Sequence, residues 1–250
     1  MLKERPIAKD SPCVPTWTDG TPDYMRLICD GERDSHYLRE RGLKPNLLYM
    51  AGDCSDARVL DVGCGDGWLL NELDPREGHA CDIVHEPDLD PQWIFALNDI
   101  RDLNYENDSF DVTAASLVLM WFEELDLAVR ELHRVTAPGG KVVISLVHPY
   151  FYRTGEPNED GDFTVSHDLS QSLDIIDLKI GGSAGPFKYH YRPWPDYLNA
   201  CVKAGLRIQE VRDWFIDMED FAQNIQHGMM SDIPRTGKVP LYSFIECSKE

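Results

Sequence analysis

The residues of this chain that could do chemistry begin with a run of glycines and acids at 61–67, reading DVGCGDG. The run follows the apolar segment 58–62 and precedes an apolar stretch that starts at Trp68, a pattern typical of a strand, a turn and a helix. The glycines allow a sharp turn, and a ligand can approach them without meeting a Cβ atom. The carboxylate of Asp61 repels a pyrophosphate and suits a cationic, ammonium-bearing ligand.

The glycine spacing separates two kinds of nucleotide-like ligand. Dinucleotide sites have the pattern GxGxxG, whereas here the third glycine comes at Gly67 and Trp68 stands in its usual place. Together with Asp61, this spacing argues against NAD and for an amino-acid-like cofactor. A nicotinamide oxidoreductase is therefore the least favoured interpretation.

Two further acids follow in order. Asp82 ends the second predicted strand and can accept hydrogen bonds from ribose hydroxyls beside the crevice of a doubly wound sheet. Asp99 follows the third predicted strand and is suited to accept from an adenine amino group. Each acid alone is equally typical of a surface residue or a turn cap. Their order after the glycine turn makes a nucleoside site the better interpretation.

Short strands and helices alternate from Arg58 onward. Strands are predicted at 58–62, 78–84, 93–97, 110–116, 141–147, 207–212 and 240–247, helices at 68–73, 125–135 and 196–204, and turns at 138–140 and Gly205. This alternation predicts an α/β fold, a doubly wound, mostly parallel seven-stranded sheet with helices on both faces.

The chain divides into four parts of a single domain. Residues 1–57 are expected to form an N-terminal helical cap, and 58–148 the cofactor-binding half of the core. Residues 149–195 are rich in Gly, Pro, Asp and aromatics, and are expected to be an inserted lid or substrate-facing segment after strand five. Residues 196–250 complete the same core.

Two further segments complete a family pattern, NDSFD at 107–111 and RELHRVTAPGGKVVI at 130–144. With the glycine turn, they make the chain resemble class I S-adenosylmethionine-dependent methyltransferases from about Arg58 to Val147, and weakly at 189–247. The resemblance is closest to bacterial small-molecule methyltransferases, where His-Pro follows strand five and an aromatic-rich lid comes next. It implies S-adenosylmethionine as cofactor and methyl transfer to an oxygen or nitrogen of a small-molecule acceptor.

The resemblance also assigns roles. It places 63–65 against the methionine moiety, with Asp61 holding its ammonium, Asp82 on the ribose, 99–100 beside the adenine and 116–117 beside the sulfonium. The full expected cofactor set is Tyr37, Asp61, Gly63, Cys64, Gly65, Asp82, Ile83, Asp99, Ile100, Ser116 and Leu117.

The chain departs from the family pattern in two places. The segment between strands two and three is short and contains Pro87 and Pro91, so the helix usual there is expected to be missing. Met120 and Trp121 stand where the family often has His-His, which removes a commonly proposed polar contact.

Catalytic candidates are few, and a base is needed only if the acceptor must lose a proton. His148 leaves strand five at the carboxyl edge of the sheet, although a histidine bonded within the His-Pro turn is the competing interpretation. His190 and Tyr191 precede Arg192, where relatives tend to show Tyr-His-Arg-Pro, so Tyr191 replaces the family histidine. Whether His190 or Tyr191 takes part in catalysis directly stays open. The nearby aromatic side chains could make cation–π contacts with an amine acceptor or could pack the lid, and this also stays open.

Composition excludes several classes. Lys plus Arg number 24 against 44 Asp plus Glu, a net charge of −20 without a basic patch, which argues against a nucleic-acid partner. The 7 cysteines show no CxxC pair and indicate reduced thiols rather than a metal site. No apolar run reaches the length of a membrane span and no secretory signal is visible, so a cytoplasmic protein is expected.

The rival from another functional class is a methyltransferase-like protein that holds the cofactor without turnover. The replaced histidines favour it, and turnover to S-adenosylhomocysteine with a panel of acceptors would discriminate. The acceptor and the oligomeric state are left open by the sequence.

Overall fold

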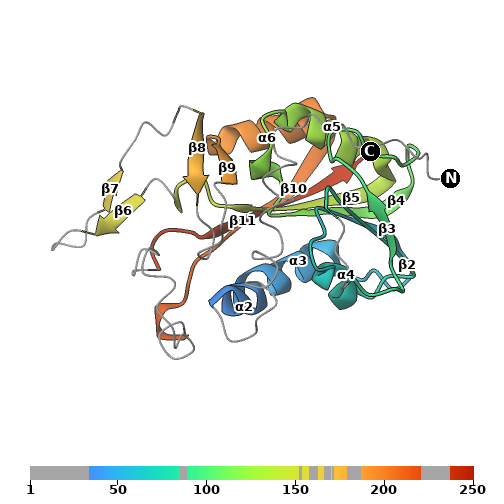
Figure 1. Cartoon of the computed structure of the whole chain (residues 1–250), viewed down its shortest axis with the longest axis horizontal. Coiled ribbons are helices and arrows are strands. Elements are labelled where there is room, and N and C mark those ends of the chain that lie inside the picture. Colours follow the sequence, from blue (N-terminus) through green and yellow to red (C-terminus); the bar gives the residue numbers. More distant parts are fainter. Residues whose placement is uncertain are drawn as a thin grey trace.

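A seven-stranded sheet forms the centre of the molecule, in the order β10-β11-β5-β4-β1-β2-β3 (Figure 1). In this computed structural model, the described residues are 34–84, 89–151, 154–157, 163–165, 170, 172–178, 187–220 and 237–250. The strands of the sheet are β1 (Arg58–Val62), β2 (Glu77–Asp82), β3 (Ile94–Leu97), β4 (Phe110–Ser116), β5 (Thr136–Val147), β10 (Leu206–Trp214) and β11 (Tyr242–Lys249).

The sheet is doubly wound and mostly parallel, as predicted. β3, β2, β1, β4 and β5 pair in parallel, whereas β11 is antiparallel to both β5 and β10. The chain runs outward from β1 to β3 and then returns to β4 beside β1. The strand order therefore reverses between β1 and β4, and the carboxyl ends of these strands are where open α/β sheets bind ligands.

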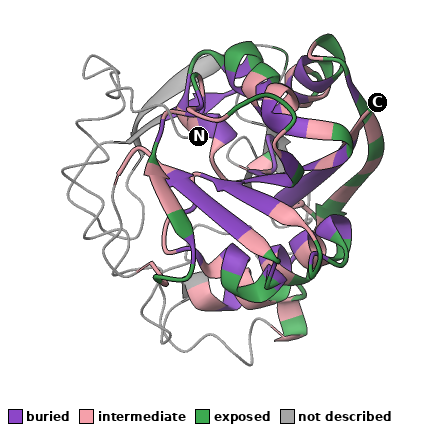
Figure 2. Ribbon diagram, turned by 90° about the vertical axis from the view of Figure 1, so that its right-hand side faces the viewer, coloured by how far each residue is buried: buried purple, intermediate pink, exposed green. Residues whose placement is uncertain are grey.

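Helices cover both faces of the sheet, each over its own apolar core. On one face lie α3 (Lys44–Ala51) and α4 (Trp68–Leu73), and on the other α5 (Leu125–Val135) and α6 (Trp194–Lys203) (Figure 1). The strand side chains alternate between these cores, so Val59 belongs to the α3 side and Leu60 to the α5 side. Both are fully buried, and the sheet interior is buried along its central strands (Figure 2).

Four predicted elements have the bounds that the structure shows: β1, α4, β4 and α5. The predicted turn at 138–140 instead lies inside β5. Thr136 already pairs with Phe110, and the register then jumps to Lys141 opposite Val112. The Pro-Gly-Gly segment is thus a bulge, with Gly139 at φ 79°. α6 begins at Trp194, two residues before the predicted start, and ends before Gly205 at φ 89°, as expected for a glycine after a helix.

The described part of the N-terminal cap is helical. It comprises α2 (Asp34–Leu38), the π-helix η1 (Arg39–Leu43) and α3. A Cβ on Gly42 would lie 2.9 Å from the ring of Trp214, which stacks on Tyr242 at 5.8 Å between centroids. This glycine lets the π-turn press against the carboxyl end of the sheet. Residues 1–33 of the predicted cap lie outside the described residues.

The expected lid contains two antiparallel strand pairs that the sequence patterns did not indicate. β6 (Thr154–Pro157) pairs with β7 (Phe163–Val165), and β8 (Leu173–Leu178) with β9 (Phe187–Tyr191). Most other residues of 152–186 lie outside the described ranges. Between β2 and β3 the described residues 83–84 and 89–93 form no helix, and Pro87 lies outside the described residues. No helix in the described ranges is long and apolar enough to cross a membrane.

Candidate cofactor and active site

The glycine turn after β1 has the backbone conformation that its sequence predicts. Gly63, Gly65 and Gly67 have φ angles of 73°, 51° and 72°, a region that side chains disfavour. A Cβ on Gly63 would also lie 2.5 Å from Cγ2 of Val118, which follows β4. The turn therefore passes so close to the end of β4 that only glycine fits.

Hydrogen bonds fasten this turn to the end of β2. The amides of Gly63 and Cys64 donate to the carbonyl of Cys81, at 2.8 and 3.1 Å. The Gly65 amide donates to Oδ2 of Asp82 at 3.1 Å. Asp82 thus lies at the glycine turn, as predicted.

Asp61 is a buried acid with an unsatisfied oxygen. The residue is 2% exposed, and its Oδ1 has no hydrogen-bond partner among the described residues. Burial first, and then the charges of Asp82 and Asp66, raise its pKa to about 8. A cation reaching this carboxylate would offset the cost of its burial. The described residues contain no cluster of three or more His, Cys, Asp or Glu that could hold a metal ion.

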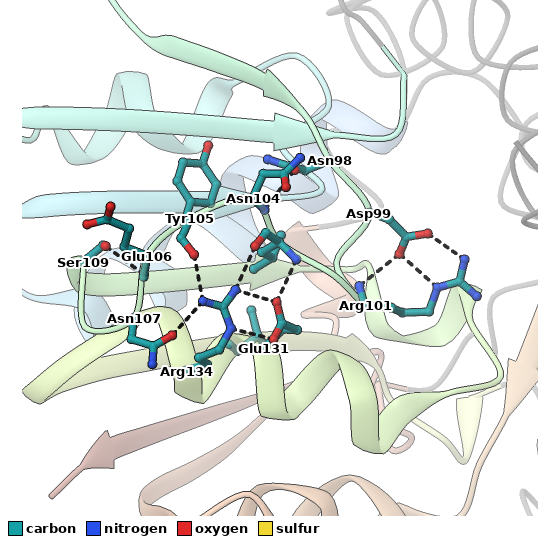
Figure 3. Close-up of polar contacts among 12 residues, drawn as sticks. Asn98, Asp99, Arg101, Asn104, Tyr105, Glu106, Asn107, Ser109, Glu131 and Arg134 are labelled. Atoms are coloured by element: carbon teal, nitrogen blue, oxygen red, sulfur yellow. Dashed lines mark hydrogen bonds and ion pairs between the residues drawn. The ribbon is translucent and has the colours of Figure 1, made fainter. Parts of the chain in front are cut away.

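Asp99 lies after β3 and is already partly engaged. Its Oδ1 accepts from the backbone amide and Nε of Arg101 at 3.0 and 2.9 Å, and its Oδ2 accepts from Nη2 at 2.6 Å (Figure 3). The Asn98 amide donates to the carbonyl of Asp82 at 2.9 Å, which joins the ends of β2 and β3. Ile100 is 2% exposed and belongs to the core beneath α5.

The end of β4 carries a strained leucine beside the turn. Leu117 has φ 53°, which is unfavourable for a side chain of its size. Its amide donates to the carbonyl of Ser145 at 3.0 Å, and its carbonyl accepts from Nε1 of Trp121 at 2.9 Å. The hydroxyls of Ser116 and Ser145 lie 3.0 Å apart. Such strain concentrates at functional sites, and here it lies at the switch point of the sheet.

The N-terminal helices reach the same edge. Nη1 of Arg39 lies 2.7 Å from Oδ2 of Asp66 in the glycine turn, and its guanidinium lies over the ring of Trp68. The hydroxyl of Tyr37 donates to Oδ2 of Asp220 at 2.9 Å, and burial with this contact raises its pKa to about 12. The hydroxyl of Tyr37 is thus already committed to a neighbouring acid.

His148 is tied into the turn that follows β5. Its Nδ1 accepts from the backbone amide of Tyr150 at 3.1 Å, and its Nε2 lies 3.8 Å from Oδ2 of Asp213. The imidazole is buried between Tyr150 and Trp194. Burial lowers its pKa, against the opposing effect of Asp213. These contacts favour the interpretation of a histidine bonded within its turn.

Arg192 lies between β9 and α6, and in the sequence it only aligned the chain with the Tyr-His-Arg-Pro pattern of the family. His190, Tyr191 and Arg192 are all buried. Nη1 of Arg192 donates to the carbonyl of Leu119 at 3.4 Å, and Nη2 donates to those of Phe122 and Glu123. The guanidinium thereby holds the turn that follows β4.

Comparisons with known proteins agree with this geometry. Residues 60–144 match the family described as "Methyltransferase domain". The malonyl-[acyl-carrier protein] O-methyltransferases of Erwinia billingiae and Halorhodospira halophila are 31% and 35% identical over 128 and 139 residues. These matches cover 48% and 49% of this chain and 45% and 46% of the relatives, so the chain spans about half the length of the curated relatives it matches.

The fold comparison extends over more of the chain. An S-adenosylmethionine-dependent methyltransferase from Mesorhizobium loti superposes with a TM-score of 0.62 at 22% identity, covering 82% of this chain and 96% of that one. The chain carries a class I methyltransferase domain. Its cofactor is S-adenosylmethionine, as the family resemblance implied.

The predicted cofactor residues of this methyltransferase domain fall into two groups. Asp61, the glycine turn and Asp82 lie together at one edge, and Ser116 and Leu117 lie beside them at the end of β4. Tyr37 bonds to Asp220, Asp99 bonds to Arg101, Ile100 packs in the core beneath α5, and Ile83 follows β2 directly. The cofactor-binding roles of both groups stay predictions.

Sequence reasoning missed three residues that shape this edge of the sheet. Val118 closes against Gly63, Arg101 orients Asp99, and Arg192 holds the carbonyls of the turn after β4. The Arg192-Pro193 motif was the one available signal for Arg192. Val118 carried none, because its approach to Gly63 is set by the packing of the sheet. Arg101 lies only two residues after its partner Asp99, so their local spacing was an available signal.

Proposed function

We propose that the chain transfers the methyl group of S-adenosylmethionine to an oxygen of a carboxylate, with malonyl thioesters as the acceptor class. The observation that carries the methyl transfer is the buried carboxylate of Asp61 beside the glycine turn, whose Oδ1 has no hydrogen-bond partner in the described part of the chain. The ammonium of the cofactor's methionine moiety supplies a positive charge that stabilises the ionised carboxylate. The acceptor class is supported by the curated relatives, which are named as malonyl-[acyl-carrier protein] O-methyltransferases.

A carboxylate acceptor also suits the residues at the carboxyl edge. Carboxyl groups have pKa values of about 4, so the attacking oxygen is already ionised near pH 7 and no base has to remove a proton. His148, the leading candidate base, has its Nδ1 occupied by the amide of Tyr150. An acceptor that needs deprotonation would require a freer group than this imidazole.

The bound cofactor supplies a methyl group on a positively charged sulfur, open to in-line displacement. The residues of the chain bind the cofactor and orient it toward the acceptor. Asp61 neutralises the ammonium, the amide of Gly65 fixes Asp82, and Leu117 shapes the wall at the end of β4. Holding acceptor and donor in attack geometry then provides much of the acceleration.

Turnover with matched acceptors tests this proposal. S-adenosylhomocysteine formation would be measured with malonyl carried on acyl carrier protein, malonyl-coenzyme A, free malonate and a primary amine. We expect turnover with the malonyl thioesters, and loss of turnover in an Asp61→Asn variant. Turnover with the amine alone would overturn the carboxylate acceptor. Cofactor binding without any turnover would instead support the silent methyltransferase-like protein.

Free malonate separates a second candidate, a small-molecule acid as acceptor. The similarity to the curated relatives covers about half of this chain, and the acceptor-binding half need not follow them. Faster turnover with the free acid than with the carrier-bound one would favour this candidate.

A further inference from the structure

Arg134 of α5 binds the loop that leads from β3 to β4. Its Nη1 donates to the carbonyl of Tyr105 at 2.7 Å and to Oδ1 of Asn107 at 3.0 Å, and its Nη2 donates to the carbonyl of Leu103 at 2.8 Å (Figure 3). One planar guanidinium therefore fixes three positions of the loop, a task that a lysine ammonium cannot perform in the same geometry.

Glu131 completes this attachment one turn earlier on α5. Its Oε1 accepts from Nε of Arg134, and its Oε2 accepts from Nη2 of Arg134 and from the amide of Leu103, all at 2.7 Å. The two side chains thus form a bidentate pair that holds Leu103 by both its amide and its carbonyl. Their side chains are 16% and 29% exposed, so solvent screens the pair only in part.

The held loop is connected to both acids of the nucleoside site. The backbone amide of Asn104, between Leu103 and Tyr105, donates to the side-chain oxygen Oδ1 of Asn98 at 3.1 Å. The amide of Asn98 donates to the carbonyl of Asp82 at 2.9 Å, and Asn98 directly precedes Asp99. A continuous set of hydrogen bonds therefore runs from α5 to the ends of β2 and β3.

The carboxylate of Asp99 is itself set in one orientation. Arg101 donates to both of its oxygens and bridges to Glu124, at the start of α5, at 2.9 Å. A carboxylate has about four lone-pair positions, and three donors from Arg101 occupy three of them. About one position is left, on Oδ2, for a donor from a ligand.

We propose that Glu131 and Arg134 are positioning residues for the nucleoside of the cofactor, because they hold the loop that places Asp99. They touch no ligand and act through the backbone of 103–105 and through Asn98. The inference rests on S-adenosylmethionine as the ligand and on the predicted contact of Asp99 with the adenine amino group. It is independent of the acceptor.

Binding of two ligands that differ at the adenine tests this role. S-adenosylhomocysteine carries the exocyclic amino group, and S-inosylhomocysteine has an oxygen in its place. Their dissociation constants would be measured by calorimetry for the full chain, Arg134→Met, Glu131→Gln and the control Arg130→Met. Arg130 lies on the same helix and is exposed, so its substitution removes the same charge without touching the loop.

We expect the wild type and Arg130→Met to prefer the adenosyl ligand equally. Arg134→Met and Glu131→Gln should lose about tenfold of this preference, a size usual for coupled residues. An unchanged preference in Glu131→Gln, even with a lower melting temperature, would show that the pair is only a structural anchor and would overturn the inference, whether or not Arg134→Met folds. A wild type that binds neither ligand would overturn the cofactor itself and the inference with it.

Discussion

Asp61 links the pH dependence of this protein to its cofactor. Its pKa of about 8 in the folded chain exceeds the ordinary value of 3.8, chiefly because the carboxyl is buried. Between these values the folded state keeps a proton that the unfolded chain has lost. By linkage, the contribution of Asp61 to stability is fully present below about pH 4 and is lost as the pH rises through about 8.

We expect cofactor binding to release a proton from Asp61 near pH 7, because the ammonium requires the ionised carboxylate. Affinity for S-adenosylhomocysteine should therefore rise with pH up to about 8. Calorimetry in buffers of different ionisation enthalpy measures the released proton directly. Asp61→Asn should abolish the release and weaken binding roughly 10- to 100-fold, the loss of a charge-assisted hydrogen bond worth about 1.5–3 kcal/mol. Proton uptake by the wild type would contradict this expectation.

At the scale of elements, two alanine substitutions measure how much the close packing of the glycine turn against the end of β4 contributes to stability. Gly63 and Gly139 have similar φ angles of 73° and 79°, but a Cβ at Gly63 would meet Val118, whereas one at Gly139 would meet nothing within 4 Å. Gly139→Ala should lower the free energy of unfolding by about 1–2 kcal/mol, the cost of the backbone conformation. Gly63→Ala adds overpacking of about 1–3 kcal/mol and should also weaken cofactor binding.

Urea unfolding of both variants, with and without S-adenosylhomocysteine, checks this difference. Gly139→Ala should bind the ligand as the wild type does. Equal losses of stability in the two variants would mean that Val118 moves aside at no cost.

Arg192 joins the β9–α6 segment to the turn after β4. Arg192→Met keeps much of the side-chain volume but leaves the carbonyls of Leu119, Phe122 and Glu123 without their donor. We expect a loss of about 2–4 kcal/mol in the free energy of unfolding, since buried unpaired acceptors cost about 1–3 kcal/mol each and some recover water. Chemical denaturation would measure it, with Arg207→Met, an exposed arginine, as the control. A loss in the free energy of unfolding no larger than that of the control would show that the contacts of Arg192 with these carbonyls are dispensable for stability.

At the scale of the whole molecule, the net charge of −20 acts on both substrates. It attracts the cationic cofactor and repels an anionic acceptor, and salt screens both effects because the Debye length falls to about 10 Å at 0.1 M. Between 50 and 300 mM salt, the KM for S-adenosylmethionine should rise and the KM for a malonyl thioester should fall, each roughly two- to fivefold. Steady-state kinetics at several salt concentrations would check both slopes. A KM for the acceptor that rises with salt would point to a cationic acceptor or a local basic surface.

Sequence patterns predicted those helices and strands in which the spacing of the apolar residues reflects the side that is buried. α5 repeats its apolar residues at helical spacing, and β4 is a short run buried at four consecutive residues, so the bounds of both are those of the structure. The bulge at 137–140 was missed, because proline and glycine mark a turn equally well inside a strand. The strand pairs β6–β7 and β8–β9 were missed because they pair among themselves, outside the seven-stranded sheet whose alternation with helices the patterns report.

The conformation of the glycine turn and the charge of Asp61 were determined by the sequence alone, since glycine adopts those φ angles most readily and an acid in that place rejects phosphate and attracts an ammonium. Tertiary structure decided everything that depends on which distant segments meet. Among the described residues it left Oδ1 of Asp61 without a partner, brought Val118 against Gly63, and set the guanidinium of Arg192 on the carbonyls after β4. A hydrogen bond depends on positions within a few tenths of an ångström, and only the packed fold sets these between residues far apart in the chain.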